Sequence, residues 1–342
     1  MKPVYIIAEA GVNHNGQLDL ALQLIDAAKK SGADAVKFQT FRTENIVTHN
    51  AGLAEYQKEN LGTEESQFQM LKALELSYDD FTELYAYART KSIDFLSTPD
   101  DEESLDFLVD DLGLPLIKIG SGEVSNLPFL RIIAAKQKSL ILSTGMSTLG
   151  EVERAVRVIR DINGEELMLL HCTTNYPCPP EEVNLKAMLT MQQAFGLSIG
   201  YSDHTLGTEV SIAAVALGAE VIEKHLTLDK KMEGPDHRAS LDPEEFAEMV
   251  RQIRVIEKVM GNGIKWPNPS EERIKPLVRR RIVASQDLVA GTSMNWNHLC
   301  FKRANQGLYA DQAESILGLR LQDALKIDEP ISLDCFFPHD KK

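Results

Sequence analysis

The sequence reads Ser-Ile-Gly-Tyr-Ser-Asp-His-Thr at residues 198–205 and Val-Ile-Glu-Lys-His-Leu-Thr at residues 221–227, so that two short apolar runs each end in a histidine. The segment between them, Glu209–Gly218, has the composition of a helix, which predicts consecutive parallel strands of a βαβ unit. His204 and His225 then stand at neighbouring strand ends. A pair of neutral imidazoles commonly holds a catalytic divalent metal, and this is our interpretation. The alternative is that one or both are structural histidines.

Six further apolar runs have the length of strands, and segments with helical periodicity separate them. In the first such segment Leu18, Leu22 and Ile25 recur at the spacing of one helix face. Strands that alternate with helices eight times within residues 1–260 predict an α/β protein with a (β/α)8 TIM barrel, and a doubly wound open sheet is the alternative. The expected strands are Val4–Ala10, Ala35–Phe41, Asp94–Thr98, Leu116–Gly120, Leu140–Ser143, Leu167–Cys172, Ser198–Ser202 and Val221–His225.

The composition limits the classes of partner. The chain has 342 residues, 43% of them apolar, and a net charge of −15, which opposes binding to nucleic acid or to an anionic membrane. No uninterrupted apolar run has the length of a membrane span, and strand-like Val4–Ile7 follows the first residues directly, so we expect a cytoplasmic protein. The four cysteines have neither CxxC nor zinc spacing and are interpreted as reduced thiols.

Two lysines lie inside the expected strands. Lys37 and Lys118 are surrounded by apolar residues, where a lysine is costly unless it faces an anion or a carboxylate. Together with Ser121, Ser143 and glycine-rich turns, they predict a cradle for a phosphate plus a carboxylate. The alternative is a lysine paired with a carboxylate of the protein. We therefore expect a small, multiply charged anion next to a metal, in a pocket that concentrates positive charge within an acidic protein.

Six motifs, taken together and in this order, resemble the sialic acid synthase family, including legionaminic acid synthases. The resemblance covers essentially the whole chain. It implies a metal-dependent condensation of phosphoenolpyruvate with the open-chain form of an N-acylmannosamine sugar, with cleavage of the C–O bond of phosphoenolpyruvate, to give a nine-carbon 2-keto sugar acid and phosphate. The motifs are residues 7–16 (IAEAGVNHNG), 36–40 (VKFQT), 118–123 (KIGSGE), 142–146 (LSTGM), 202–205 (SDHT) and 234–237 (GPDH).

The resemblance also implies roles for individual residues. His204 and His225 match the ligands of a divalent metal, Mn or Mg. The positions that match residues holding phosphoenolpyruvate are Lys37, Lys118, Ser121, Ser143 and Ser202, and those on the side of the sugar and the reaction centre are Glu9, Gln39, Tyr176 and Asp236. We add Thr98, at the end of the third expected strand, to the substrate-binding set, and take His204, His225 and Glu9 as catalytic.

Glu9 is the candidate that positions or deprotonates the attacking water, and its alternative role is that of a structural hydrogen-bond acceptor. Two positions depart from the family pattern. Asp100 stands where phenylalanine is common, and Asn175 stands where glutamate is common. Both departures bear on the sugar pocket rather than on the reaction.

The identity of the sugar is the open question. We take N-acetylmannosamine as the expected sugar and N-acetylneuraminate as the product. The alternative sugar is 2,4-diacetamido-2,4,6-trideoxymannose, which differs at C4 and C6 and gives N,N'-diacetyllegionaminate. Two other kinds of protein remain open: an inactive sugar-binding barrel, and a metal-dependent aldolase that acts on pyruvate.

The C-terminal part has a different pattern. Residues 261–280 are rich in glycine and proline and predict an extended linker. Residues 281–342 contain two similar stretches, Asp287–Met294 and Ala324–Ile331, and resemble the β-clip domain, also called SAF or antifreeze-like, of the same family. Arg303 matches the family's arginine that enters the site of the partner subunit, which implies a domain-swapped homodimer. Ala304 and Gln306, beside it, depart from the family motif.

Overall fold

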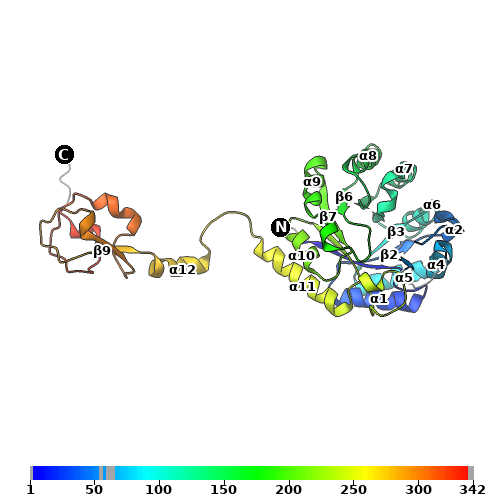
Figure 1. The fold of residues 1–342 in the computed structure, drawn as a ribbon, viewed down its shortest axis with the longest axis horizontal. Helices are drawn as coiled ribbons and strands as arrows, with labels where there is room; N and C mark the ends of the chain where they lie inside the picture. Colours follow the sequence, from blue (N-terminus) through cyan, green and yellow to red (C-terminus); the bar gives the residue numbers. More distant parts are fainter. Residues whose placement is uncertain (1–2, 54–56, 59–65, 338–342) are drawn as a thin grey trace. The chain divides into compact units, whose positions relative to one another are not determined.

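The computed structural model describes residues 3–53, 57–58 and 66–337. The chain divides into two compact units, Met1–Asn262 and Gly263–Lys342 (Figure 1). No helix in the described ranges combines the length and the apolar character needed to cross a membrane.

The first unit is built on eight parallel strands. Their neighbour order is β3-β2-β1-β8-β7-β6-β5-β4, and the end strands β3 and β4 also contact each other, so the sheet curls into a barrel. Because the first strand pairs with both the second and the eighth, the doubly wound alternative is wrong and the (β/α)8 barrel is confirmed. The strands are β1 (Tyr5–Gly11), β2 (Ala35–Thr40), β3 (Asp94–Pro99), β4 (Leu116–Ile119), β5 (Ser139–Ser143), β6 (Leu167–His171), β7 (Ser198–Asp203) and β8 (Val221–His225).

Helices surround these strands (Figure 1). In α8 (Leu149–Arg160), Thr148 and Glu151 form a capping box, and Val152, Val156 and Ile159 share the buried face. Such caps and apolar stripes explain why helices form between the strands. The others are α1 (Leu18–Lys30), α2 (Thr43–Ile46), α4 (Gln67–Leu74), α5 (Tyr78–Lys91), α6 (Glu102–Asp106), α7 (Leu127–Ala135), α9 (Lys186–Phe195), α10 (Glu209–Ala216) and α11 (Pro243–Val259).

The barrel interior changes from apolar to polar along the strands. One apolar cluster of strand residues fills the interior on the side of the amino ends of the strands: Ile7, Ala35, Leu96, Ile141, Leu170 and Val221. Since side chains on one face of a strand recur every second residue, the next inward positions hold the polar groups. Ile7 is thus followed by Glu9, Ala35 by Lys37, Leu96 by Thr98, Ile141 by Ser143 and Val221 by Glu223. The strand period therefore places polar groups in one layer at the carboxyl ends of the strands.

The second unit contains helix α12 (Pro269–Val278) and an antiparallel pair, β9 (Arg281–Ala284) with β10 (Leu299–Lys302). Its core includes Ile282, Leu288 and Ile316. The two similar stretches noted in the sequence meet in this unit, where Leu288 and Leu325 exchange backbone hydrogen bonds of 2.8 and 2.9 Å. The last five residues of the expected domain, 338–342, lie outside the described residues.

The expectation of an extended linker over residues 261–280 is wrong for Pro269–Val278, which are helical. Proline is favourable at the first helical position because its fixed φ suits the helix and it lacks an amide proton that would stay unpaired there. The Asn268 backbone N–H donates to Glu271 Oε2 at 2.8 Å, which further fixes the first turn.

Candidate active site

The polar layer at the carboxyl ends of the strands encloses a cavity of about 210 Å³, which we call the catalytic cavity. Every strand of the barrel, or the loop that follows it, contributes to it, as expected for the functional face of such a barrel. Its lining includes Glu9, Lys37, Gln39, Thr98, Asp100, Lys118, Ser121, Ser143, Cys172, Thr174, Tyr176, Ser202, His204, Glu223 and His225.

All but two of the side chains expected from the sequence line this cavity. Asp236 is not among the lining residues, but its Oδ2 lies 3.8 Å from His225 Nδ1, so it is adjacent to the pair of histidines, His204 and His225. Arg303 belongs to the second unit, where its side chain is exposed. The barrel by itself therefore assembles the expected site apart from Arg303.

The two histidines face each other with ring centroids 5.5 Å apart. His204 Nδ1 lies 2.6 Å from the carbonyl oxygen of Thr173, which can only accept, so Nδ1 carries the proton and Nε2 has a lone pair. Nε2 lies 3.3 Å from Ser202 Oγ, whose proton is donated to Glu223, so this hydroxyl does not use the lone pair. His225 Nδ1 is buried and has no hydrogen-bond partner in the described part of the chain. Burial lowers the pKa of His204 to about 4 and that of His225 well below its ordinary value, so both rings are neutral at pH 7.

These features fit a divalent metal. A metal-binding histidine normally presents one lone pair to the metal while its other nitrogen donates to a carbonyl or carboxylate, as His204 does to Thr173. The described residues contain no group of three or more His, Cys, Asp or Glu side chains that converge as a metal site. Two imidazoles would thus supply the protein ligands and leave the other coordination positions to water and substrate.

The two in-strand lysines are linked through buried glutamates. Lys37 Nζ lies 2.7 Å from Glu9 Oε2 and 3.8 Å from Glu223, and Lys118 Nζ lies 3.8 Å from Glu223. Lys118 also donates to Ser143 Oγ at 2.7 Å. The structure thus shows the alternative given for these lysines, pairing with carboxylates of the protein, which offset their positive charge.

The pKa values of this cluster follow from its burial. Burial alone would lower the pKa of Lys37, but Glu223 and Glu9 hold it above its ordinary value. Burial lowers the pKa of Lys118, against the opposing effect of Glu223. Burial raises the pKa of Glu9 in spite of Lys37, so this carboxyl is the group in the cluster that most readily takes up a proton near neutral pH.

The remaining expected residues frame the cavity. Ser121 Oγ accepts the backbone N–H of Gly145 at 2.9 Å, which ties the turn after β4 to the turn after β5. The Tyr176 ring lies 4.1 Å from that of His204, centroid to centroid. Gln39 Nε2 donates to Glu9 Oε1 at 3.2 Å and so orients the carboxylate. The cavity thus has a lysine side near Lys118 and a histidine side near Tyr176.

The site hypothesis drawn from the sequence did not include two of the charged lining residues. Glu223 accepts a hydrogen bond of 2.8 Å from Ser202 Oγ and lies near both lysines. It stands two residues before His225 in β8, and the two-residue period of a strand places the two on the same face. Asp100 lines the same cavity just after β3. The sequence did indicate that Asp100 is unusual, because it stands where phenylalanine is common in the family.

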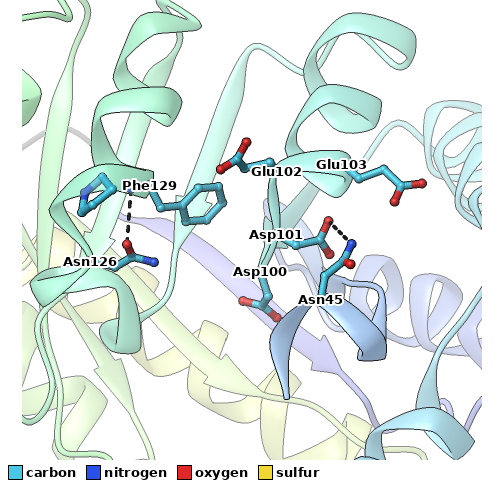
Figure 2. Close-up of a pocket in the computed structure, with 8 residues that line it drawn as sticks. Asn45, Asp100, Asp101, Glu102, Glu103, Asn126 and Phe129 are labelled. Carbon is cyan, nitrogen blue, oxygen red and sulfur yellow. Dashed lines mark hydrogen bonds between the residues drawn. The ribbon is translucent and has the colours of Figure 1, made fainter. Parts of the chain in front are cut away.

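Asp100 also lines a second cavity, of about 480 Å³, beside the catalytic cavity. Asp100, Asp101 and Asn45 lie on one side of this second cavity and Asn126 and Phe129 on the other (Figure 2). Pro128, Glu102 and Glu103 complete its lining.

Comparison with known proteins shows which proteins this chain is similar to. The model of the NeuB family matches residues 24–265. The chain is 50% identical to the N,N'-diacetyllegionaminic acid synthase of Campylobacter jejuni, over 97% of this chain and 99% of the relative. It is 49% identical to the protein of the same name from Legionella pneumophila, over 93% of this chain and 90% of the relative. It is 35% identical to the crystal structure of the N-acetylneuraminic acid (sialic acid) synthetase of Leptospira borgpetersenii, over 80% and 90% of the two chains, with a TM-score of 0.71.

Proposed function

Because the chain belongs to the NeuB family, we propose that it is an enzyme that condenses phosphoenolpyruvate with an open-chain N-acylated amino sugar, releasing phosphate and a nine-carbon 2-keto sugar acid. The observation that carries this proposal is the catalytic cavity, in which a lysine and serine cradle adjoins a pair of neutral histidines. The free cysteines of the described chain support the reducing, cytoplasmic compartment that we propose for the reaction.

The similarities favour the alternative sugar. The relatives at 50% and 49% identity are named N,N'-diacetyllegionaminic acid synthases, whereas the sialic acid synthetase is 35% identical. We therefore propose 2,4-diacetamido-2,4,6-trideoxymannose as the sugar and N,N'-diacetyllegionaminate as the product. This sugar replaces N-acetylmannosamine as our first expectation.

Phosphoenolpyruvate carries a phosphate and a carboxylate, and both need donors. Lys118 and Ser143, already within 2.7 Å of each other, offer an ammonium group and a hydroxyl to one of these anions. Lys37 is held by Glu9 at 2.7 Å, so a bound anion competes with Glu9 for this lysine. Ser121 and Ser202 supply further hydroxyls at the cavity wall. The lysines retain phosphoenolpyruvate and stabilise the phosphate as the C–O bond breaks.

His204 and His225 would hold a divalent metal, manganese or magnesium, and such an ion would supply Lewis-acid chemistry at the aldehyde oxygen of the sugar. Their neutral rings leave the positive charge of the ion undiminished. Tyr176, whose ring centroid lies 4.1 Å from that of His204, lines this side of the cavity and orients the sugar. Asp236 Oδ2 lies 3.8 Å from His225 Nδ1 and adjoins the same side.

Glu9 is the base of the proposed reaction. After C3 of phosphoenolpyruvate bonds to the aldehyde carbon, water adds at C2, and its proton needs an acceptor. The Glu9 carboxylate is buried, faces the cavity and has a raised pKa, which suits a group that takes up a proton near neutral pH. Gln39 and Lys37 fix its orientation through contacts of 3.2 and 2.7 Å.

We propose that the second unit is the β-clip (SAF) domain of the family and that it acts in a domain-swapped homodimer. Its short antiparallel pair and the bridge between Leu288 and Leu325 support the domain assignment. Arg303 is exposed and forms no ion pair with another described residue, as expected of a group that acts on another subunit.

The proposed function is tested by phosphate release from phosphoenolpyruvate, measured with and without the sugar and with and without Mn²⁺. We expect release only when phosphoenolpyruvate, 2,4-diacetamido-2,4,6-trideoxymannose and the metal are all present. Turnover with pyruvate in place of phosphoenolpyruvate would identify an aldolase instead. Binding of the sugar without turnover would identify a sugar-binding barrel, and either result would overturn the proposal.

A further inference from the structure

We propose that Asp100 selects the diacetamido sugar: its carboxylate accepts the amide N–H of the C4 acetamido group, whose acetyl part occupies the second cavity. This inference rests on the proposed function and concerns the part of the sugar that lies away from the reacting aldehyde.

The first argument is space. The catalytic cavity, about 210 Å³, is smaller than the roughly 300–1,000 Å³ of typical small-molecule sites, although it must receive phosphoenolpyruvate together with a sugar. The second cavity adds about 480 Å³, and Asp100 lines both. In the order of the sheet, β3 is separated from the histidine strands β8 and β7 by β2 and β1. In the proposed arrangement, the aldehyde of the sugar lies at the histidines and its distal carbons extend across the cavity toward Asp100.

The second argument is the state of the carboxylate. Asp101, next in the chain, accepts hydrogen bonds from Arg42 N, Ser104 N and Ser104 Oγ at 2.8–2.9 Å and so serves as the cap of α6. The Asp100 side chain is half-buried and has no hydrogen bond or ion pair in the described part of the chain. Burial, reinforced by Glu123, raises its pKa from 3.8 to about 7, so a ligand donor would relieve a carboxylate that is poorly solvated.

The third argument is the chemistry of the second cavity. Asp100, Glu102 and Glu103 make it acidic, which repels phosphoenolpyruvate but accepts a neutral group that donates a hydrogen bond. Phe129 and Pro128 add an apolar surface that fits the acetyl methyl group (Figure 2). A third cavity, about 560 Å³, adjoins the catalytic cavity at Met146 and Cys172 but is also lined by Lys186. It lies on the side of Ser143, toward the anion cradle, and is the less suitable of the two for a neutral amide.

The test compares two sugars that differ only at C4: 2,4-diacetamido-2,4,6-trideoxymannose and 2-acetamido-2,6-dideoxymannose, which has a hydroxyl there. The ratio of their kcat/KM values is measured by phosphate release for the unaltered full chain, for Asp100→Ala and Asp100→Asn, and for the matched control Asp111→Ala. Asp111 is exposed and lines none of the three cavities.

We expect Asp100→Ala to lower the preference for the diacetamido sugar by about tenfold to a hundredfold, the range of a hydrogen bond to a charged group. Asp100→Asn, which keeps an acceptor without the charge, should lower it less, and Asp111→Ala should leave the ratio unchanged. An unchanged ratio for Asp100→Ala with turnover retained, or an equal loss on both sugars, would overturn the proposal. If the unaltered enzyme turned over neither sugar, the proposed function itself would fail, which is a separate result.

Discussion

His225 is the residue on which the proposed metal chemistry depends most. Its Nδ1 is buried without a hydrogen-bond partner in the described chain, and Asp236 Oδ2 lies 3.8 Å from it. We predict that His225→Ala abolishes metal-dependent phosphate release and weakens Mn²⁺ binding, measured by calorimetry, with an unchanged far-UV circular dichroism spectrum. His49→Ala, at an exposed histidine, is the control and should change neither property. Full turnover by the His225 variant would remove the role given to this residue.

The raised pKa of Asp100 should make the unfolding free energy of the chain depend on pH. A carboxyl whose pKa rises from 3.8 to about 7 on folding binds its proton more tightly in the folded chain. Its contribution to stability is complete below about pH 4 and is lost as the pH rises through about 7. We therefore predict that the unfolding free energy of Asp100→Asn, relative to the unaltered chain, increases between roughly pH 5 and pH 8.

The size of this change between roughly pH 5 and pH 8 is about 3 kcal/mol, because about two units of the pKa shift lie in this range and one unit corresponds to about 1.4 kcal/mol. Urea unfolding in the presence of EDTA at several pH values measures it without interference from a metal. A difference that stayed constant over this range would show that the Asp100 carboxyl is not perturbed by folding.

At the scale of single residues, the sequence predicted most of the catalytic cavity but not how its charges are paired. Lys37 and Lys118 were recognised because lysine inside an apolar strand is costly. Their partners Glu9 and Glu223 come from β1 and β8, and the pairing depends on the register of the closed barrel. A sequence does not give that register directly. The role proposed for Asp100 likewise required knowing that two cavities meet at its side chain.

At the scale of elements, strands β7 and β8 are joined behind the histidines by a fully buried ion pair. Lys224 Nζ lies 3.0 Å from Asp203 Oδ2, and both side chains are 0% exposed. Asp203 directly precedes His204 in the sequence, and Lys224 directly precedes His225. Lys224 also donates to the Thr205 carbonyl, and Asp203 accepts from Ser211 Oγ. This network fixes the two strand ends relative to each other.

We predict that Lys224→Met destabilises the fold by about 3–5 kcal/mol, because it leaves the Asp203 charge buried without its ammonium partner. Urea unfolding measures this loss. Lys230→Met removes the exposed partner of Glu245 and should cost less than about 1 kcal/mol. Similar losses for the two variants would show that the buried pair does not fix the strand ends.

The boundaries of the strands could be predicted to within about two residues because apolar runs and polar turns alternate clearly. The linker prediction did not include helix α12, because three prolines and two glycines within residues 261–276 favour an extended chain, whereas Asn268 and Glu271 cap a helix. Pro276 lies inside this helix, near its end, where the lost backbone bond affects only the last turn. Local composition therefore predicted the wrong conformation for this segment.

At the scale of the whole molecule, the sequence indicated two parts, and the chain divides between Asn262 and Gly263. The proposal that Arg303 enters the barrel of a partner subunit rests on the resemblance to the family, because the sequence of one chain does not specify how two chains assemble. In the domain-swapped dimer that we propose, each active site would combine His225 of one subunit with Arg303 of the other.

We predict that Arg303→Ala and His225→Ala, each inactive alone, restore activity when their subunits are mixed. In a mixed dimer one site carries both changes and the other carries neither, so random exchange of equal amounts gives about a quarter of the normal number of sites. Mass spectrometry of differently labelled subunits confirms the exchange. Complete exchange without recovery of activity would place Arg303 in its own subunit or outside the site.

The central claim is that the chain forms a carbon–carbon bond between phosphoenolpyruvate and the diacetamido sugar while the C–O bond of phosphoenolpyruvate breaks. Phosphoenolpyruvate labelled with ¹⁸O at the bridging oxygen tests it most directly, with phosphate and the keto acid analysed by mass spectrometry. The account predicts that the label leaves entirely with phosphate and that one nine-carbon keto acid forms for each phosphate. Phosphate without the label, or phosphate released without the sugar, would contradict it.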